Sequence, residues 1–221
     1  MDCRVLRVPR KRQQMTVTGI KEITKSRMKI EIDGEFAFVL YKGELRVYGI
    51  KENQEISEEI YQKILTEVLS KRAKLRAMNL LKSRAYTSFQ LKEKLEMGGY
   101  PGKIIEEAID YVTSFGYVND GQYAIDFIEY NKETKSKNRI YADLYKKGIS
   151  RDIIEEAWND VVGEDRAELE REQIIYWINK KNFFPETASL QEKQKMMAFL
   201  YRKGFSNETI RSVLSLDITT I

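Results

Sequence analysis

Two basic stretches hold the side chains of this chain that are best suited to binding chemistry. The first, residues 71–84, contains no acid, and its cations are Lys71, Arg72, Lys74, Arg76, Lys82 and Arg84. In the second, residues 132–151, the cations that we consider for a site are Lys135, Lys137, Arg139, Lys146 and Lys147. A basic surface that recurs along a chain complements a phosphate backbone or an acidic groove. The alternative interpretation of both stretches is an ordinary solvated face with alternating charge.

Other residue types argue against catalysis. The chain has no histidine, which removes the commonest general base and the commonest zinc ligand. The adjacent acids Glu106-Glu107 and Glu155-Glu156 point about 100° apart around a helix. A solvated pair near a helix start, where the helix dipole favours acids, explains them without catalysis. We therefore expect no catalytic residue, no cofactor and no metal site, and nothing in the sequence supports a carboxylate-metal nuclease.

A repeated unit must position these side chains. The segment from Ile104 to Ala108 recurs unchanged 49 residues later, and the segments 91–110, 140–159 and 196–215 align without gaps around Gly99, Gly148 and Gly204. A unit used three times indicates an array of small helical modules. The sequence predicts a mostly α fold, a tandem array of three three-helix, helix-turn-helix-like repeats with a small N-terminal antiparallel β module.

The β module is predicted from period-two patterns and turn residues. Residues 28–32 alternate between apolar and charged side chains, and Asp33-Gly34 is a strong two-residue hairpin signal before a strand at residues 35–41. Residues 16–23 can supply another strand. Lys42-Gly43-Glu44 predicts a second turn that leads into a further strand at residues 45–48.

Helix starts and packing residues follow from local signals. Ser57 predicts a helix start, and three capping-box patterns pair Thr87 with Gln90, Asp165 with Glu168, and Ser189 with Glu192. Most aromatic residues stand at the spacing of a helical core, which favours packing over base stacking: Phe89, Tyr111, Phe115, Tyr123, Phe127, Trp158, Phe199 and Phe205.

The helix-turn-helix pattern does not by itself indicate DNA reading. In DNA-reading examples the second helix of the motif presents basic and amide side chains to the major groove. Here residues 104–129 carry only acidic charges, which phosphates would repel. The motif is therefore interpreted as a way of packing helices.

The predicted parts of the chain are a basic flexible leader (1–14), a small β module (15–56), a linking helix with repeat 1 (57–118), repeat 2 (119–163) and repeat 3 (164–221). Residues 1–12 carry five bases against Asp2, a net charge of +4 that equals the total for the chain. A nucleic-acid-binding arm and a flexible leader are both compatible with this charge. Cys3 is the only cysteine, and no secretory signal or membrane span is evident, so we expect a cytoplasmic protein.

The order and spacing of several residues resemble the RecX regulatory family of bacteria. The resemblance is carried by Leu80, Leu81 and Arg84, by Leu91 and Leu95 before Gly99-Tyr100, by residues 116–120 with Tyr123-Ala124, and by Arg139-Ile140 before Leu144 and residues 147–149. It covers residues 73–160 well and the third unit more loosely, where the glycines stand 56 rather than 49 residues apart.

The resemblance implies a non-enzymatic regulator of homologous recombination, DNA repair and the SOS response. Members of this family bind the RecA recombinase, particularly its filament on single-stranded DNA, and restrain filament growth, ATP hydrolysis and strand exchange. The basic residues named above are then expected at the contact surface, and direct DNA contact is possible. The alternative is a stand-alone, sequence-independent nucleic-acid-binding protein, which the nearly neutral body of the chain disfavours.

Overall fold

The computed structural model describes residues 15–163 and 165–215, which fall into two compact units. The first unit contains residues up to Arg84 and Leu91–Phe115, and the second contains Ala85–Gln90 and the chain from Gly116 onward. The basic leader predicted at residues 1–14 lies outside the described residues. Among the described residues, no helix combines the length and apolar character that crossing a membrane requires.

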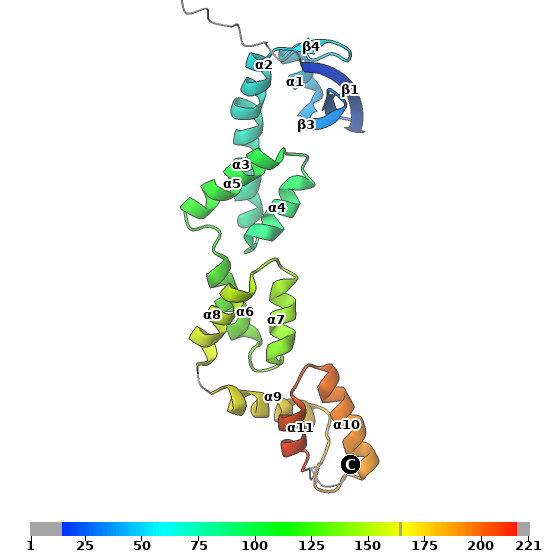
Figure 1. Ribbon diagram of the computed structural model, residues 1–221, viewed down its shortest axis with the longest axis vertical. Helices are drawn as coiled ribbons and strands as arrows, with labels where there is room; N and C mark the ends of the chain where they lie inside the picture. The colour runs from blue at the N-terminus through cyan, green and yellow to red at the C-terminus, as the bar shows by residue number, and fades with distance from the viewer. Residues whose placement is uncertain (1–14, 164, 216–221) are drawn as a thin grey trace, which may run out of the picture. The chain divides into compact units, whose positions relative to one another are not determined.

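The elements confirm a mostly helical chain with a small sheet at its N-terminal end (Figure 1). The strands are β1 (Met15–Thr24), β2 (Arg27–Ile32), β3 (Glu35–Tyr41) and β4 (Glu55–Ile56). The helices are α1 (Lys42–Val47), α2 (Glu58–Lys63), the π-helical turn η1 (Ile64–Leu69), α3 (Ser70–Leu81), α4 (Ser88–Glu96), α5 (Gly102–Ser114), α6 (Asp120–Asn131), α7 (Lys137–Tyr145), α8 (Arg151–Val162), α9 (Arg166–Lys180), α10 (Leu190–Arg202) and α11 (Asn207–Val213).

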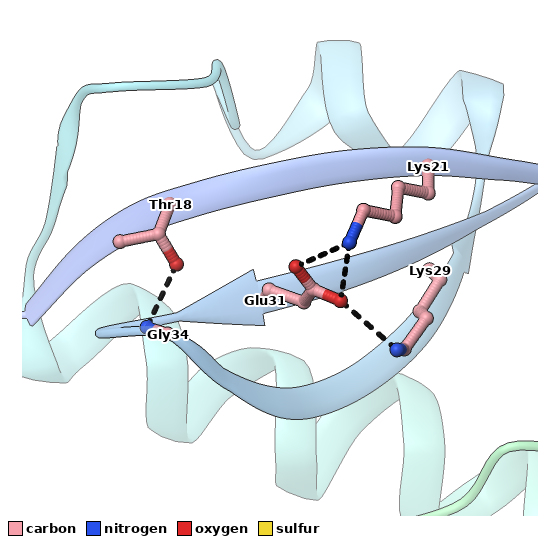
Figure 2. A network of polar contacts seen from close by, with 5 residues as sticks. All are labelled: Thr18, Lys21, Lys29, Glu31 and Gly34. Carbon is pink, nitrogen blue, oxygen red and sulfur yellow. Dashed lines mark hydrogen bonds and ion pairs between the residues drawn. The ribbon is translucent and has the colours of Figure 1, made fainter.

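The sheet is antiparallel in the order β3-β2-β1-β4. Asp33 and Gly34 both have positive φ, 50° and 87°, as a tight hairpin turn requires, so the predicted hairpin is confirmed. The backbone N–H of Gly34 donates to Thr18 Oγ1 at 2.8 Å, which ties this turn to β1 (Figure 2). Side chains from the sheet, including Ile30, Phe38 and Leu40, are completely buried and form the core of the module.

The strand predicted at residues 45–48 is wrong, because the chain forms α1 there. Glu44, in the first turn of α1, accepts a hydrogen bond from the backbone N–H of Tyr41 at 2.7 Å and so holds the start of the helix. The same carboxylate pairs with Arg72 of α3. Val47, which would be an inward residue of a strand, is 77% exposed.

Each repeat consists of three helices: α3, α4 and α5; α6, α7 and α8; and α9, α10 and α11 (Figure 1). The aligned positions are buried alike. Leu95, Leu144 and Leu200 are completely buried, and so are the equivalent isoleucines of the third helices, to within about one per cent: Ile105, Ile154 and Ile210. Residues that the repeat alignment places at equivalent positions are therefore equivalent core residues of the three repeats.

Most of the predicted helix starts are confirmed. Ser57 Oγ accepts a hydrogen bond from the N–H of Ile60, and Thr87 with Gln90 and Ser189 with Glu192 exchange the two hydrogen bonds of a capping box. The capping box predicted at Asp165 is wrong, because its side chain makes no cap hydrogen bond. Arg166 instead donates from Nε to the carbonyl of Gly163 at 3.2 Å.

Candidate partner-binding surface

In each repeat, the turn between the second and third helices contains a backbone carbonyl that accepts a hydrogen bond from a side chain outside the turn. Just before the repeated glycine, the carbonyl of Lys147 accepts a hydrogen bond from Thr87 Oγ1 at 2.6 Å, and that of Lys203 accepts one from Ser136 Oγ at 2.7 Å. In the first unit, the equivalent carbonyl of Gly98 accepts from Nη2 of Arg27 in the sheet. The β module thus supplies in repeat 1 the donor that a hydroxyl supplies in repeats 2 and 3.

The close approach at these turns explains the glycines themselves. A Cβ on Gly148 would lie 2.2 Å from Cβ of Phe89, and one on Gly204 would lie 2.8 Å from Oγ of Ser136. Both glycines also have a left-handed backbone, with φ of 81° and 91°. The turn therefore docks with its backbone against the preceding segment and brings the neighbouring lysine side chain with it.

That lysine lies over aromatic rings in both repeats. Lys147 Nζ is 5.6 Å from the ring centroids of Tyr123 and Phe127. Lys203 Nζ is 4.0 Å from the ring of Trp177 and 5.5 Å from that of Phe199. A cation over a ring face is stabilised by the quadrupole of the ring.

The expectation that the aromatic residues pack against the helical cores is confirmed for most of them. Trp158 and Phe205 are buried, each 2% exposed. Three more are partly buried and pack against the cores of repeats 2 and 3, with lysines over their outer faces: Tyr123, Phe127 and Phe199. Phe89 and Phe115 differ, because they are 43% and 60% exposed.

A pocket of about 400 Å³ lies in the first unit between the sheet, α3 and the end of α4. Its cations are Arg27, Arg72, Arg76 and Lys94, with Tyr41 and Tyr100 among the other lining residues. Burial raises the pKa of Tyr100, so its hydroxyl stays protonated near neutral pH. Arg72 is held inside this pocket, 4.6 Å from the ring centroid of Tyr41 and paired with Glu44.

A second pocket of about 610 Å³ lies in the second unit, where repeat 2 meets repeat 3. Five cations and no carboxylate line it, together with several aromatic rings: Lys135, Arg139, Lys180, Arg202, Lys203, Tyr176, Trp177, Phe199 and Phe205. It occupies the same place in the repeat as the first pocket, because the alignment pairs Lys94 with Phe199, Met97 with Arg202 and Tyr100 with Phe205.

The predicted basic residues are distributed over three environments. The two pockets contain Arg72, Arg76, Lys135 and Arg139. A second group lies over aromatic rings: Lys74, Lys137 and Lys147. The third group is exposed elsewhere on the surface: Lys71, Lys82, Arg84 and Lys146. The pockets also contain basic residues that sequence reasoning missed: Arg27, Lys94, Lys180 and Arg202.

Lys137 shows how burial changes the chemistry of one of these cations. Its Nζ lies 5.0 Å from the ring of Tyr141 and 5.5 Å from that of Trp158. Burial lowers the pKa of Lys137, and the positive charge of Arg166 lowers it further. An anion brought to this lysine would favour its charged form and so oppose the shift.

No metal centre accompanies these pockets in the part of the chain that is described. Within residues 15–163 and 165–215, no three side chains of the metal-ligating acidic, cysteine or histidine types are grouped closely enough to hold an ion. The arrangement is suited to binding anionic groups through lysine and arginine, with aromatic rings beside them.

Three family models match the repeats in order. Residues 73–111 match the model described as the first three-helix domain of RecX, residues 119–157 match the second three-helix domain, and residues 168–214 match the third.

Whole-chain comparisons give the same result. The regulatory protein RecX of Caldanaerobacter subterraneus subsp. tengcongensis is 33% identical over 198 residues, which cover 89% of this chain and 96% of the relative. The regulatory protein RecX of Clostridioides difficile is 33% identical over 195 residues, covering 86% and 88%.

Solved structures share the fold. A crystal structure of a regulatory protein RecX superimposes with a TM-score of 0.58 at 22% identity, over 91% of this chain and 99% of the other. The structure of RecX from Lactobacillus salivarius gives a TM-score of 0.56 at 22% identity, over 66% of this chain and 95% of the other.

Proposed function

This chain belongs to the RecX family of regulatory proteins, and we propose that it binds the RecA recombinase and its filament on single-stranded DNA. On binding it restrains filament growth, ATP hydrolysis and strand exchange, and it does so as a cytoplasmic regulator without an active site of its own. The names of the relatives, which are regulatory proteins, support this role.

One observation carries the proposal. In both units, cations and aromatic rings gather beside the glycine turn of a repeat, in pockets that no carboxylate lines. Because the turns recur with the repeat, the basic groups recur along the chain, as binding to a polymeric, anionic partner requires. A filament of protein on a single strand is such a partner.

The test is ATP hydrolysis by RecA on single-stranded DNA, titrated with this protein. We expect strong suppression well below one copy per RecA protomer, because a regulator that caps or bridges a filament acts on many protomers at once. Suppression that appears only when the DNA itself is saturated would indicate competition for the strand, and would favour the stand-alone nucleic-acid-binding protein. Unchanged hydrolysis with intact filaments would contradict the proposal.

A charge-reversal variant locates the contact. Exposed cations of the predicted set are changed together in Lys71→Glu, Arg76→Glu, Lys82→Glu and Lys146→Glu. We expect binding to the filament to weaken at least about tenfold, because several interfacial charges are reversed. The matched control reverses the same number of exposed lysines elsewhere: Lys25, Lys51, Lys92 and Lys103. Equal weakening by both variants would mean that only net charge matters, and would remove the predicted surface.

A further inference from the structure

The pocket of the second unit has a feature that a merely basic surface lacks, a floor of aromatic rings. Tyr176 and Trp177 on α9 are in edge contact at 5.6 Å between centroids, and Trp177 is in edge contact with Phe199 of α10 at 5.7 Å. Tyr176 is 38% exposed, and both Trp177 and Phe199 are partly exposed. Planar surface is therefore accessible from the pocket.

The floor is held in place by hydrogen bonds from one repeat to the next. Trp177 donates from Nε1 to the carbonyl of Thr134 at 3.0 Å, and Gln173 donates from Nε2 to the carbonyl of Lys135 at 2.9 Å. Gln173 is only 2% exposed, so its amide is a buried positioning group. The indole of Trp177 is therefore oriented before any ligand arrives, which lowers the entropy cost of binding.

The cations around this floor differ in whether they form an ion pair with a carboxylate. Lys135 and Arg139 both pair with Asp143, at 3.1 and 3.2 Å. Lys180 Nζ lies 5.0 Å from the ring of Trp177, and Lys203 Nζ lies 4.0 Å from it. Neither Lys180, Lys203 nor Arg202 forms an ion pair with a carboxylate of the described residues. These three cations can pair with an external anion without breaking an ion pair of the described chain.

We propose that this pocket binds one unpaired nucleotide of a single strand. The base lies against Tyr176 and Trp177, where the ammonium groups of Lys180 and Lys203 rest in the unbound chain. Those ammonium groups, together with Arg202, move to the flanking phosphates. The inference deepens the function proposed above and rests on it, since it assigns to repeat 3 the direct contact with the strand of the filament.

A nucleotide fits this pocket better than an acidic peptide does. Sequence-independent single-strand sites combine cations that follow the backbone with aromatic rings that stack bases. An acidic peptide would use the cations but would leave the ring surface without a planar partner. The volume of about 610 Å³ also lies within the usual range of small-ligand sites, about 300–1,000 Å³.

The first-unit pocket serves as an internal comparison. At the equivalent position it has Lys94 in place of Phe199, and its cations are mainly arginines. Arg72 already covers the ring of Tyr41 while it is paired with Glu44. In the first-unit pocket the ring of Tyr41 is thus covered by an arginine that is already paired, whereas in the second-unit pocket Tyr176 and Trp177 are covered by lysines without an ion pair in the described chain.

Tryptophan fluorescence tests the stacking directly. The chain has two tryptophans, of which Trp158 is 2% exposed and Trp177 lines the pocket. A short oligothymidylate is titrated into the native protein, and we expect quenching that saturates. In Trp177→Phe, which leaves Trp158 as the reporter, we expect that quenching to be lost. We also expect the affinity for a labelled strand to fall, because a smaller ring replaces the indole and the hydrogen bond from Nε1 to the carbonyl of Thr134 is lost.

Two further ligands separate the possible sources of binding. An abasic strand of the same length keeps the phosphates without the bases, and we expect its affinity to be at least about tenfold lower, since stacking stabilises each base appreciably. Polyglutamate represents an acidic protein partner. Equal binding of the abasic strand, or displacement of the oligothymidylate by polyglutamate at equal charge concentration, would overturn the proposal.

The double variant Lys180→Glu/Arg202→Glu tests the cations. We expect affinity for the strand to fall at least about tenfold, and the slope of log affinity against log salt to fall by about 1.4, two phosphate contacts at about 0.7 each. The control is Lys193→Glu, which reverses one charge nine residues before Arg202 on the same helix and hence on its opposite side. An unchanged affinity in the double variant would contradict the site.

Failure of this inference and failure of the proposed function give different results. If the native protein restrains RecA but oligothymidylate leaves its fluorescence unchanged, the regulatory function stands and the nucleotide site is refuted. If oligothymidylate quenches Trp177 but RecA is unaffected, the site stands and the regulatory function is refuted.

Discussion

At the scale of single residues, the sheet contains a small ion network around Glu31 (Figure 2). Its carboxylate accepts hydrogen bonds from Lys29 Nζ at 2.9 Å and from Lys21 Nζ at 3.0 Å, which joins β1 to β2 on one face. The hydrogen bonds from Lys29 and then Lys21 lower the pKa of Glu31 below its ordinary value of 4.5. The ionised form is therefore favoured by folding.

The consequence is a pH-dependent contribution to stability. Because the folded pKa is lowered, the contribution of Glu31 is fully present above the unfolded value near 4.5 and is lost as pH falls through the folded value. We expect Glu31→Gln to lower the melting temperature slightly at neutral pH, since its lysine partners are exposed and solvent screens the ion pairs. The difference from the native protein should disappear in acid. A difference that does not change with pH would contradict this role.

The glycine at the turn of repeat 2 allows a sharper test. In Gly148→Ala, the new Cβ would lie 2.2 Å from Phe89 and the backbone would keep a φ of 81°. The strained backbone and the steric clash should together destabilise the fold by about 2–5 kcal/mol. Gly116→Ala is the matched control, because Gly116 has a similar φ of 72° but nothing within 4 Å of the added atom. Urea unfolding compares the two, and equal losses would mean that the close approach contributes nothing.

At the scale of elements, the caps of the second helices also join one repeat to the next. Ser136 caps α7 by accepting from the N–H of Arg139, and its own hydroxyl hydrogen goes to the carbonyl of Lys203 at 2.7 Å. Ser150 caps α8 in the same way but is exposed and has no such second partner in the described chain. One serine thus combines a local role with a long-range role, and the other has the local role alone.

Alanine substitutions separate these roles. Ser150→Ala should destabilise the protein by about 1 kcal/mol, the usual loss of an N-cap. Ser136→Ala should cost about 2–3 kcal/mol, because it also leaves a backbone carbonyl without its donor at a site that is 1% exposed. Denaturant midpoints measure both. If the two losses agree within a few tenths of a kcal/mol, the hydrogen bond between repeats has no net stabilising effect.

The difference between local and long-range contacts also bears on which elements could be predicted from sequence. The hairpin at Asp33-Gly34 and the cap at Ser189 depend on neighbouring residues, so their signals are complete within a few positions of the chain. The repeats could be predicted because the same short pattern recurs, 49 residues later in the second unit of the alignment. Helix α1 was missed because a tyrosine before Glu44 is not a usual start signal, although Glu44 accepts from the N–H of Tyr41. The pairing of Glu44 with Arg72, 28 residues away, has no local signal. The cap predicted at Asp165 fails although its signal is local: Asp165 makes no cap hydrogen bond, and Arg166 donates to the carbonyl of Gly163.

At the scale of the whole molecule, the sequence predicted some of the basic residues of the two pockets, but not those that the fold brings in from distant elements. Clusters of like charge along the sequence identify Arg76 and Arg139. Each pocket, however, is assembled from elements that are distant in the sequence, and these bring in Arg27 from the sheet and Lys180 from α9. The aromatic residues show the limit most clearly. Periodicity places Phe199 on the inward side of its helix, where it packs against the core of repeat 3, but cannot show that lysines also lie over its ring.

The division into two compact units has a thermodynamic consequence. Each unit has its own buried residues, such as Leu95 in the first and Ile128 and Leu200 in the second, all completely buried. Repeat arrays are stabilised mainly by contacts between neighbours, so their cooperativity can break between weakly coupled parts. We expect scanning calorimetry to give a calorimetric enthalpy larger than the van't Hoff enthalpy, which indicates more than one cooperative step.

Two variants assign the steps to the units. Leu95→Ala removes a buried side chain of the first unit, at a cost of about 2–5 kcal/mol, and should lower the temperature of one transition only. Gly148→Ala lies in the second unit and should lower the other. If both variants shift a single transition by similar amounts, the chain unfolds as one cooperative body. In that case, unfolding of any one repeat would disrupt the whole of the proposed filament-binding surface. If the two units unfold in separate steps, the second-unit pocket should persist while the first unit is unfolded.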